Sequence, residues 1–126
     1  MRDNAKETIL IVEDEVLIQM VLKDFLDELG YSVISASDAK SAMLHLLSDA
    51  SIDLLLTDVA LPGMNGRELA DAARKLRPSL PVLFATGYGD EHEDLRKDLA
   101  PGMAVIAKPF KMELLGQAAR ALMLRP

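Results

Sequence analysis

The stretch LLLTDVALPG, residues 54–63, contains a short apolar run, a single acid and a Pro-Gly turn in close succession. A short apolar run bounded by a turn is typical of a strand that is buried on both faces of a parallel sheet. Asp58 then lies at the carboxyl end of that strand, where ligands bind in open α/β sheets. Asp58 can equally cap the next helix, since Asp is a favoured N-cap residue. A second acidic strand end near the start of the chain favours a binding site.

Length and composition indicate one globular domain. The chain has 126 residues, of which 50% are hydrophobic, and this is enough for a single core. The sequence has no cysteine, which excludes disulfides, thiolate metal sites and a cysteine nucleophile. The net charge of −6 argues against nucleic-acid binding, and no apolar run is long enough to span a membrane. We therefore expect a cytoplasmic protein with one domain over residues 1–126 and no output domain.

Apolar runs of strand length alternate with helical patterns along the chain. Strands are predicted at Thr8–Val12, Tyr31–Ala36, Ile52–Thr57, Pro81–Ala85 and Met103–Ala107. Helices are predicted at Val16–Leu29, Ala39–Leu47, Arg67–Leu76 and Lys111–Leu124, with a short, charged helix that begins at Asp90. Each connection is long enough for a crossover. The pattern predicts an α/β fold with a doubly wound, five-stranded parallel sheet in the order 2-1-3-4-5, flanked by five helices.

Several predicted helices carry more apolar residues than one buried face needs. In residues 16–29, one stripe at helical spacing is formed by Ile18, Val21, Leu22, Phe25 and Leu29. Four further residues widen that surface: Val16, Leu17, Met20 and Leu26. In residues 39–47, the predicted inward residues are Ala42, Met43, Leu46 and Leu47. We interpret the excess on residues 16–29, beside the acids at 13–15, as a contact surface for a partner protein.

Polar residues stand at the ends of four predicted strands. They are Glu13 and Asp14 after the first, Asp58 after the third, Thr86 after the fourth and Lys108 after the fifth. In the order 2-1-3-4-5, strands 1 and 4 flank strand 3, so these side chains converge around Asp58. The consecutive acids at residues 13–15 can also form a simple solvated turn that favours the dipole of the next helix. Their occurrence together with the other polar strand ends favours a functional site.

Phosphoryl transfer is the chemistry that suits these groups. A carboxylate such as Asp58 forms an acyl phosphate when the donor is activated and the charge is neutralised. Lys108 supplies a cation, and the Thr86 hydroxyl can hydrogen-bond a phosphoryl oxygen.

The same strand ends predict a magnesium site. Carboxylate and carbonyl oxygens are the ligands that Mg²⁺ prefers, with several waters retained. Glu13, Asp14 and Asp58 supply the carboxylates, and the main-chain carbonyl of Ala60 can complete the shell.

Four motifs give the sequence a close resemblance to a known family over essentially its whole length. They are IVEDE at residues 11–15, TD at 57–58 with PGMNG at 62–66, ATG at 85–87 and KPF at 108–110. With these motifs the chain resembles the receiver domain of two-component response regulators, which has a flavodoxin-like fold. The resemblance implies that Asp58 accepts phosphate from a phosphohistidine on a sensor histidine kinase or a histidine phosphotransfer protein.

The resemblance also implies roles for the other residues of the site. It implies Mg²⁺ at Glu13, Asp14, Asp58 and the Ala60 carbonyl. It further implies that Thr86 is the switch hydroxyl, that Lys108 contacts the phosphate, and that the Lys108–Pro109 peptide bond is a candidate for the cis form.

The sequence departs from many receivers on the last strand. Three residues before Lys108, where many receivers carry a switch Tyr or Phe, this chain has Val105. The run FATGY at residues 84–88 instead resembles the "FAT GUY" subgroup, whose members are typically stand-alone receivers. We hypothesise that phosphorylation orders the segment from Gly87 to Leu99, because Gly87 loosens the backbone beside the switch hydroxyl.

Two alternative functions and the partners follow from the same residues. An aspartate-nucleophile phosphohydrolase needs a second acid two residues after the nucleophile, and this chain has Ala60 there. A degenerate receiver used only for docking is the other alternative, although all five site residues are present. We expect no enzymatic activity beyond its own phosphorylation and dephosphorylation, an unknown downstream effector protein, and no nucleic-acid or membrane partner. A thin second apolar face in residues 111–124 permits a weak dimer as well as a monomer.

Overall fold

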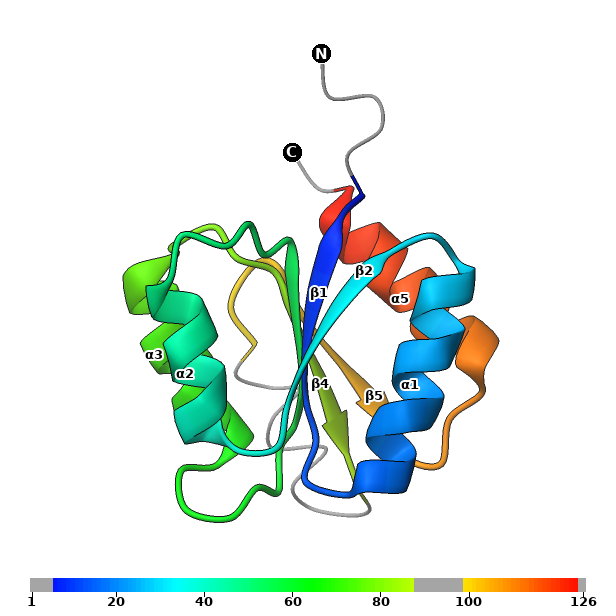
Figure 1. Ribbon diagram of the computed structural model, residues 1–126, viewed down its shortest axis with the longest axis horizontal. Helices are drawn as coiled ribbons and strands as arrows, with labels where there is room; N and C mark the ends of the chain where they lie inside the picture. Colours follow the sequence, from blue (N-terminus) through cyan, green and yellow to red (C-terminus); the bar gives the residue numbers. More distant parts are fainter. Residues whose placement is uncertain (1–5, 88–98, 125–126) are drawn as a thin grey trace.

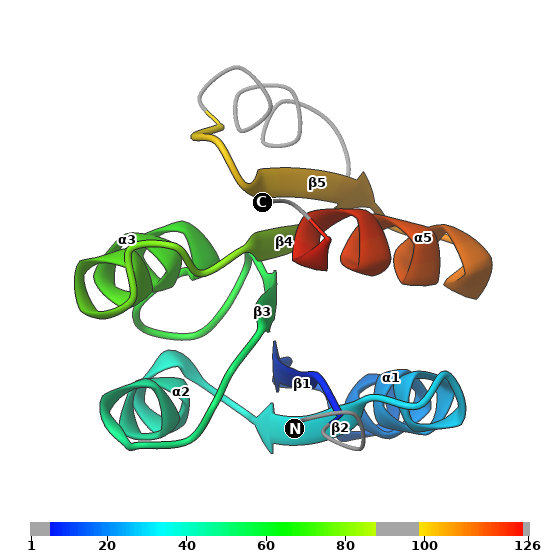
Figure 2. The same cartoon turned by 90° about the horizontal axis from the view of Figure 1, so that it is seen from above.

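Five apolar stretches form one parallel sheet, in the order that the sequence predicted. The computed structural model describes residues 6–87 and 99–124. Its strands are β1 (Thr8–Val12), β2 (Ser32–Ala36), β3 (Leu54–Asp58), β4 (Val82–Thr86) and β5 (Met103–Ala107). Neighbouring strands pair in parallel in the order β2-β1-β3-β4-β5, with β3 at the centre (Figures 1 and 2). Asp58, predicted just after the third strand, is its last residue.

Helices cover both faces of the sheet, so the predicted doubly wound arrangement is confirmed. One layer holds α1 (Val16–Glu28) and α5 (Met112–Met123), and the other holds α2 (Ala39–Leu47) and α3 (Gly66–Leu76), as Figure 2 shows. The described residues contain these four helices, where the prediction had five. The remaining predicted helix begins at Asp90 and lies outside the described residues. Every helix within residues 6–87 and 99–124 is too short or too polar to cross a membrane.

The strands are mostly apolar because helices cover the sheet on both sides. In β1, Ile9 and Ile11 pack with residues of α1 and α5, whereas Leu10 and Val12 pack with residues of α2 and α3. All four side chains are at most 1% exposed. Side chains alternate between the faces along a strand, so each strand contributes to two cores. This is why the sequence shows continuous apolar runs without polar alternation.

The buried face of α1 differs from the predicted stripe. Its buried residues are Leu22 and Leu26, while Phe25 is partly buried. The prediction placed Val21 and Leu29 in the core stripe, but these side chains are 53% and 49% exposed. Apolar residues occur on several sides of this helix, so their spacing alone did not show which side faces the sheet.

Helix α2 shows a similar error at its last residue. Leu46 is buried and Leu47 is exposed, although the prediction placed both inward. Adjacent residues on a helix point about 100° apart, so two neighbouring leucines cannot both lie at the centre of one buried face. Ala39, which the prediction did not include, is buried instead.

The two leucines at the end of α2 give a test of this packing. We expect Leu46→Ala to lower the free energy of unfolding by about 2–5 kcal/mol, because it removes a side chain that is 2% exposed. Leu47→Ala, at a side chain that is 62% exposed, is expected to change the free energy by no more than about 0.5 kcal/mol. Urea denaturation followed by circular dichroism measures both values. Equal losses for the two variants would contradict the observed orientation of α2.

Candidate functional site

The site lies at the carboxyl edge of the sheet, where the backbone ladder extends past the strand ends. In three places, the backbone N–H of the residue that follows a strand donates to a carbonyl oxygen at the end of the neighbouring strand. These bonds join Glu13 to Ala36 at 3.0 Å, Val59 to Ala85 at 3.0 Å, and Lys108 to Thr86 at 2.7 Å. The sheet therefore holds Glu13 and Lys108 in place, although these two residues follow their strands in sequence.

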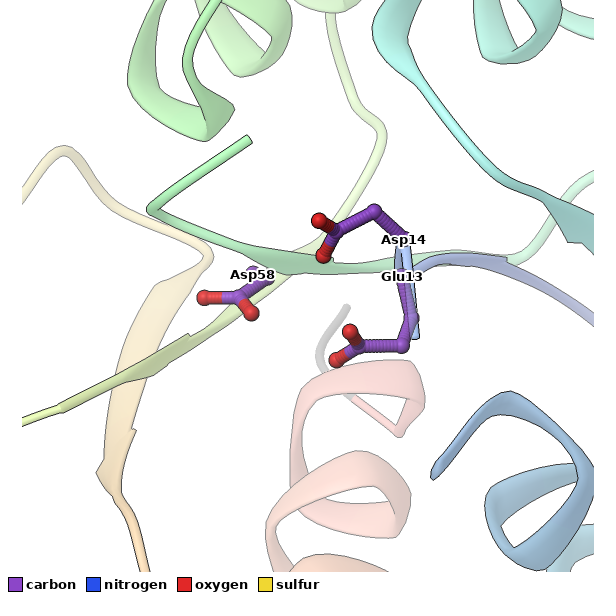
Figure 3. Close-up of side chains that lie close together, drawn as sticks. All are labelled: Glu13, Asp14 and Asp58. Atoms are coloured by element: carbon purple, nitrogen blue, oxygen red, sulfur yellow. The ribbon is translucent and has the colours of Figure 1, made fainter. Parts of the chain in front are cut away.

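Three carboxylates meet at this edge, as the strand order predicted. One oxygen each of Glu13, Asp14 and Asp58 lies within 4.8 Å of the others. Figure 3 shows the side chains of Glu13 and Asp14, from the end of β1, reaching toward the side on which Asp58 lies. Glu13 and Asp58 are only 3% and 8% exposed, whereas Asp14 is exposed to solvent. The arrangement brings together negative charges that repel one another, two of them at buried positions.

Lys108 provides the positive charge of the cluster. Its Nζ donates to Asp58 Oδ2 at 2.7 Å and lies 3.6 Å from Glu13 Oε1. Burial lowers the pKa of Lys108, but the hydrogen bond to Asp58 and the charges of Asp58 and Glu13 outweigh it, so that the pKa lies above its ordinary value. The Lys108–Pro109 peptide bond is cis, as the resemblance implied.

The second oxygen of Asp58 is also held. Asp58 Oδ1 accepts a hydrogen bond from the backbone N–H of Ala60 at 3.2 Å. Ala60, whose carbonyl was predicted to bind metal, therefore lies in the turn that contacts Asp58. Each carboxylate oxygen of Asp58 has a donor, so the side chain has a fixed orientation at the end of β3.

Glu13 is an acid whose ionisation is opposed by its surroundings. Burial raises the pKa of Glu13, while the hydrogen bond from the Glu15 N–H and the charge of Lys108 lower it. The charge of Asp58 and a hydrogen bond with Asp14 raise it further, and the net result is a pKa above the ordinary value. The ionised carboxylate is thus less favourable in the folded protein than in the unfolded chain.

Thr86 has a buried hydroxyl at the end of β4. Its side chain is 0% exposed, and its Oγ1 has no hydrogen-bond partner within the described part of the chain. A buried hydroxyl without a partner costs about 1–3 kcal/mol. This oxygen can therefore form a new hydrogen bond when a suitable group reaches the site.

The start of α3 packs tightly on the end of β3. Asn65 and Glu68 form a capping box, in which each side chain accepts from the other residue's backbone N–H. A Cβ atom on Gly66 would collide with the Asp58 carbonyl oxygen and lie 2.9 Å from the Val59 Cα. Gly66 does not have a positive φ, unlike Gly63 in the same loop. Gly66 is needed for close approach.

Two donors to Glu13 were not predicted from the sequence. The Glu15 backbone N–H donates to Glu13 Oε2 at 2.9 Å, and the Gln19 side chain donates to the Glu13 carbonyl at 2.9 Å. A backbone donor cannot be recognised from the residue type, because every residue except proline has one. Gln19 could have been recognised, because it is a polar residue directly after Ile18 in an otherwise apolar turn.

One family model matches most of the chain. The family model of the response regulator receiver domain matches residues 9–120 of the chain. The chain belongs to the response regulator receiver family. The candidate site therefore lies in a receiver domain, at the strand ends where β1, β3, β4 and β5 supply its polar groups.

Curated relatives of this receiver domain include both regulators and kinases. The two-component response regulator PhoP of Pseudomonas aeruginosa is 34% identical over 117 residues, which are 93% of this chain and 52% of that protein. The sensor histidine kinase RcsC of Escherichia coli is 34% identical over 116 residues, 91% of this chain and 12% of the kinase. The chain thus spans about half or less of these curated relatives.

Solved receiver structures have the same fold. A response regulator receiver protein from Sinorhizobium medicae has a TM-score of 0.86 at 26% identity, covering 94% of this chain and 95% of that one. The receiver domain of NtrX from Brucella abortus has a TM-score of 0.82 at 30% identity, covering 94% and 99%. The flavodoxin-like receiver fold predicted from the sequence is confirmed.

The raised pKa of Glu13 gives a prediction about stability. A group whose folded pKa is raised contributes stability at low pH, and this contribution is lost as the pH rises through the folded pKa. We therefore expect Glu13→Gln to raise the Tm at pH 7 by roughly a few degrees in EDTA, because it removes a buried charge. Thermal denaturation measures the difference, which should shrink as the pH is lowered.

The exposed neighbour Glu15 is the matched control for this test. Glu15→Gln removes the same charge from the same turn and is expected to leave the Tm nearly unchanged. A Glu13→Gln variant that is less stable than the wild type at pH 7 would contradict the electrostatic reasoning.

Proposed function

We propose that the protein is a phosphoacceptor receiver of a two-component system or phosphorelay, in which Asp58 takes a phosphoryl group from a phosphohistidine. The observation that carries the proposal is the setting of Asp58: a carboxylate fixed at both oxygens, in contact with Lys108 and close to two further acids. Membership of the receiver family supports the same role.

The proposed step is a direct displacement at phosphorus. An oxygen of Asp58 attacks the phosphorus of the phosphohistidine, a P–O bond forms and the P–N bond breaks, and the histidine nitrogen keeps the electron pair. Lys108 moves its hydrogen bond from Asp58 to a phosphoryl oxygen, which offsets the charge that develops there. The Ala60 N–H holds the carboxylate during the approach.

Thr86 is proposed to respond to the phosphoryl group. Its hydroxyl is buried at the edge that holds Asp58 and has no partner among the described residues. A phosphoryl oxygen on Asp58 would supply the missing acceptor, so the acyl phosphate favours a position of Thr86 that reaches it. The predicted ordering of the segment from Gly87 to Leu99 would begin there; most of that segment lies outside the described residues.

The donor set fits Mg²⁺. Glu13, Asp14 and Asp58 would hold the ion through carboxylate oxygens within 4.8 Å of one another, together with the carbonyl of Ala60. The exposure of Asp14 leaves room for the waters that Mg²⁺ retains. When bound, Mg²⁺ neutralises charge on the phosphoryl oxygens.

A sensor histidine kinase or a histidine phosphotransfer protein is the proposed donor. The N-terminal part of α1, next to the acidic turn, exposes a patch formed by Val16, Leu17, Met20 and Val21. A group of neighbouring, exposed apolar side chains is typical of a surface that contacts another protein. Because the patch begins directly after the carboxylates, a partner bound to it can bring its phosphohistidine to Asp58.

The remaining predictions belong to the same proposal. Four statements stay predictions: no enzymatic activity beyond its own phosphorylation and dephosphorylation, a cytoplasmic location, membership of the FAT GUY subgroup, and an effector protein as the downstream partner. A phosphohydrolase is not favoured, since the position two residues after Asp58 holds Ala60 and no acid. A docking-only role is not favoured either, because the acids and Lys108 lie together and the backbone of Lys108 is bonded to that of Thr86.

Phosphorylation of Asp58 can be tested directly. With acetyl phosphate and Mg²⁺, we expect intact-protein mass spectrometry to show one added phosphoryl group, which disappears in Asp58→Asn because the amide cannot form an acyl phosphate. Asp71→Asn, at an exposed acid of α3, is the matched control and should be modified as the wild type is. Modification that persists in Asp58→Asn would contradict the proposal.

The α1 patch can be tested in the transfer reaction. Leu17→Glu, at a side chain that is 76% exposed, is expected to slow phosphotransfer from the cognate donor about tenfold, through the loss of apolar contact. Phosphorylation by acetyl phosphate should be unchanged, since it needs no protein contact.

The control for the α1 variant is Leu44→Glu on α2, on the opposite face of the sheet. Leu44 is 67% exposed, and the substitution should leave transfer at the wild-type rate. Transfer rates come from single-turnover assays with the phosphorylated donor. If both variants slow transfer equally, the patch on α1 is not the contact.

A further inference from the structure

Gln19 of α1 connects the helix to two strand ends beneath the candidate site. Its Nε2 donates to the carbonyl oxygen of Glu13 at 2.9 Å and to that of Ala36 at 3.2 Å. These carbonyls lie at the ends of β1 and β2, which are adjacent in the sheet. The Gln19 amide group therefore donates two hydrogen bonds, and together they link the ends of β1 and β2 beside Glu13 and Asp14.

The two carbonyls have little access to other donors. Glu13 is 3% exposed and Ala36 is 4% exposed. The Ala36 carbonyl also accepts from the Glu13 N–H at 3.0 Å, so Gln19 completes a small network around one peptide. Loss of the amide would leave the buried carbonyl of Glu13 without this donor, which is unfavourable in the folded protein.

The network restrains the backbone that carries the two acids. Glu13 is fixed at its N–H by Ala36, at its carboxylate by the Glu15 N–H and at its carbonyl by Gln19. The Glu13 carbonyl belongs to the peptide that leads into Asp14, so the same contact restrains both acids. Loss of a residue that hydrogen-bonds to a metal ligand typically lowers the affinity for the metal 10–100-fold.

We infer that Gln19 is a positioning residue that holds Glu13 and Asp14 in the geometry that Mg²⁺ requires. The inference rests on the proposed function, because it concerns the cation site of the receiver. Mg²⁺ demands nearly octahedral ligands, whereas Ca²⁺ accepts a flexible shell. A loosened turn should therefore weaken Mg²⁺ binding more than Ca²⁺ binding. A merely structural role of Gln19 would not change that ratio.

The test is cation binding by the unphosphorylated protein, measured by isothermal titration calorimetry. Gln19→Met keeps the length of the side chain and removes its donors. We expect its Mg²⁺ Kd to rise about tenfold or more, with a smaller rise for Ca²⁺. Gln19→Asn keeps the amide but shortens its reach, and we expect the same change in Kd. It provides the test if the methionine variant folds poorly. Thermal denaturation in EDTA measures the general loss of stability separately.

The matched control is Gln117→Met, at an exposed glutamine of α5, which should bind both cations as the wild type does. Wild-type Mg²⁺ affinity in the folded Gln19 variants overturns the inference and leaves the proposed function intact. Equal losses for Mg²⁺ and Ca²⁺ also overturn it, since they indicate only a structural role. A wild-type protein that binds no Mg²⁺ overturns the metal site of the proposed function and the inference with it.

Discussion

The ion pair between Lys108 and Asp58 is the interaction on which the candidate site depends. Three carboxylates gather at one edge of the sheet, and two of them are buried, where water screens their repulsion poorly. Lys108 offsets that repulsion from 2.7 Å on Asp58 and 3.6 Å on Glu13. Its own backbone is held by the end of β4. The charges can therefore assemble only when β1, β3, β4 and β5 have taken their places.

Two groups of the site lie in surroundings that lower the stability of the folded protein. Glu13 ionises less readily than in the unfolded chain, and the Thr86 hydroxyl lacks a partner among the described residues. Such departures from local consistency are typical of functional sites and are offset elsewhere in a fold. Here the two apolar cores, one on either side of the sheet, offset the free-energy cost of these groups. Phosphorylation and a divalent cation would remove part of the cost.

The last strand distinguishes this chain from many receivers. Where those carry an aromatic residue three positions before the lysine, this chain has Val105, which is partly buried against the core on the α2 and α3 face. A change that begins at Thr86 therefore has no aromatic ring at that position to move. Any signal from the site must leave it through other residues.

The strands, their order in the sheet and the residues of the site could be predicted from the sequence. Apolar runs buried on both faces give parallel strands, and the acid, hydroxyl and lysine at their ends must then share one edge, since parallel strands end together. Only the tertiary structure decided which apolar side chains are buried, such as Leu46 rather than Leu47. The contacts of Gln19 and Gly66 also became visible only in the structure, because they depend on distances between helix and strand ends. Periodicity records a repeat along one element, whereas such contacts arise only when elements pack.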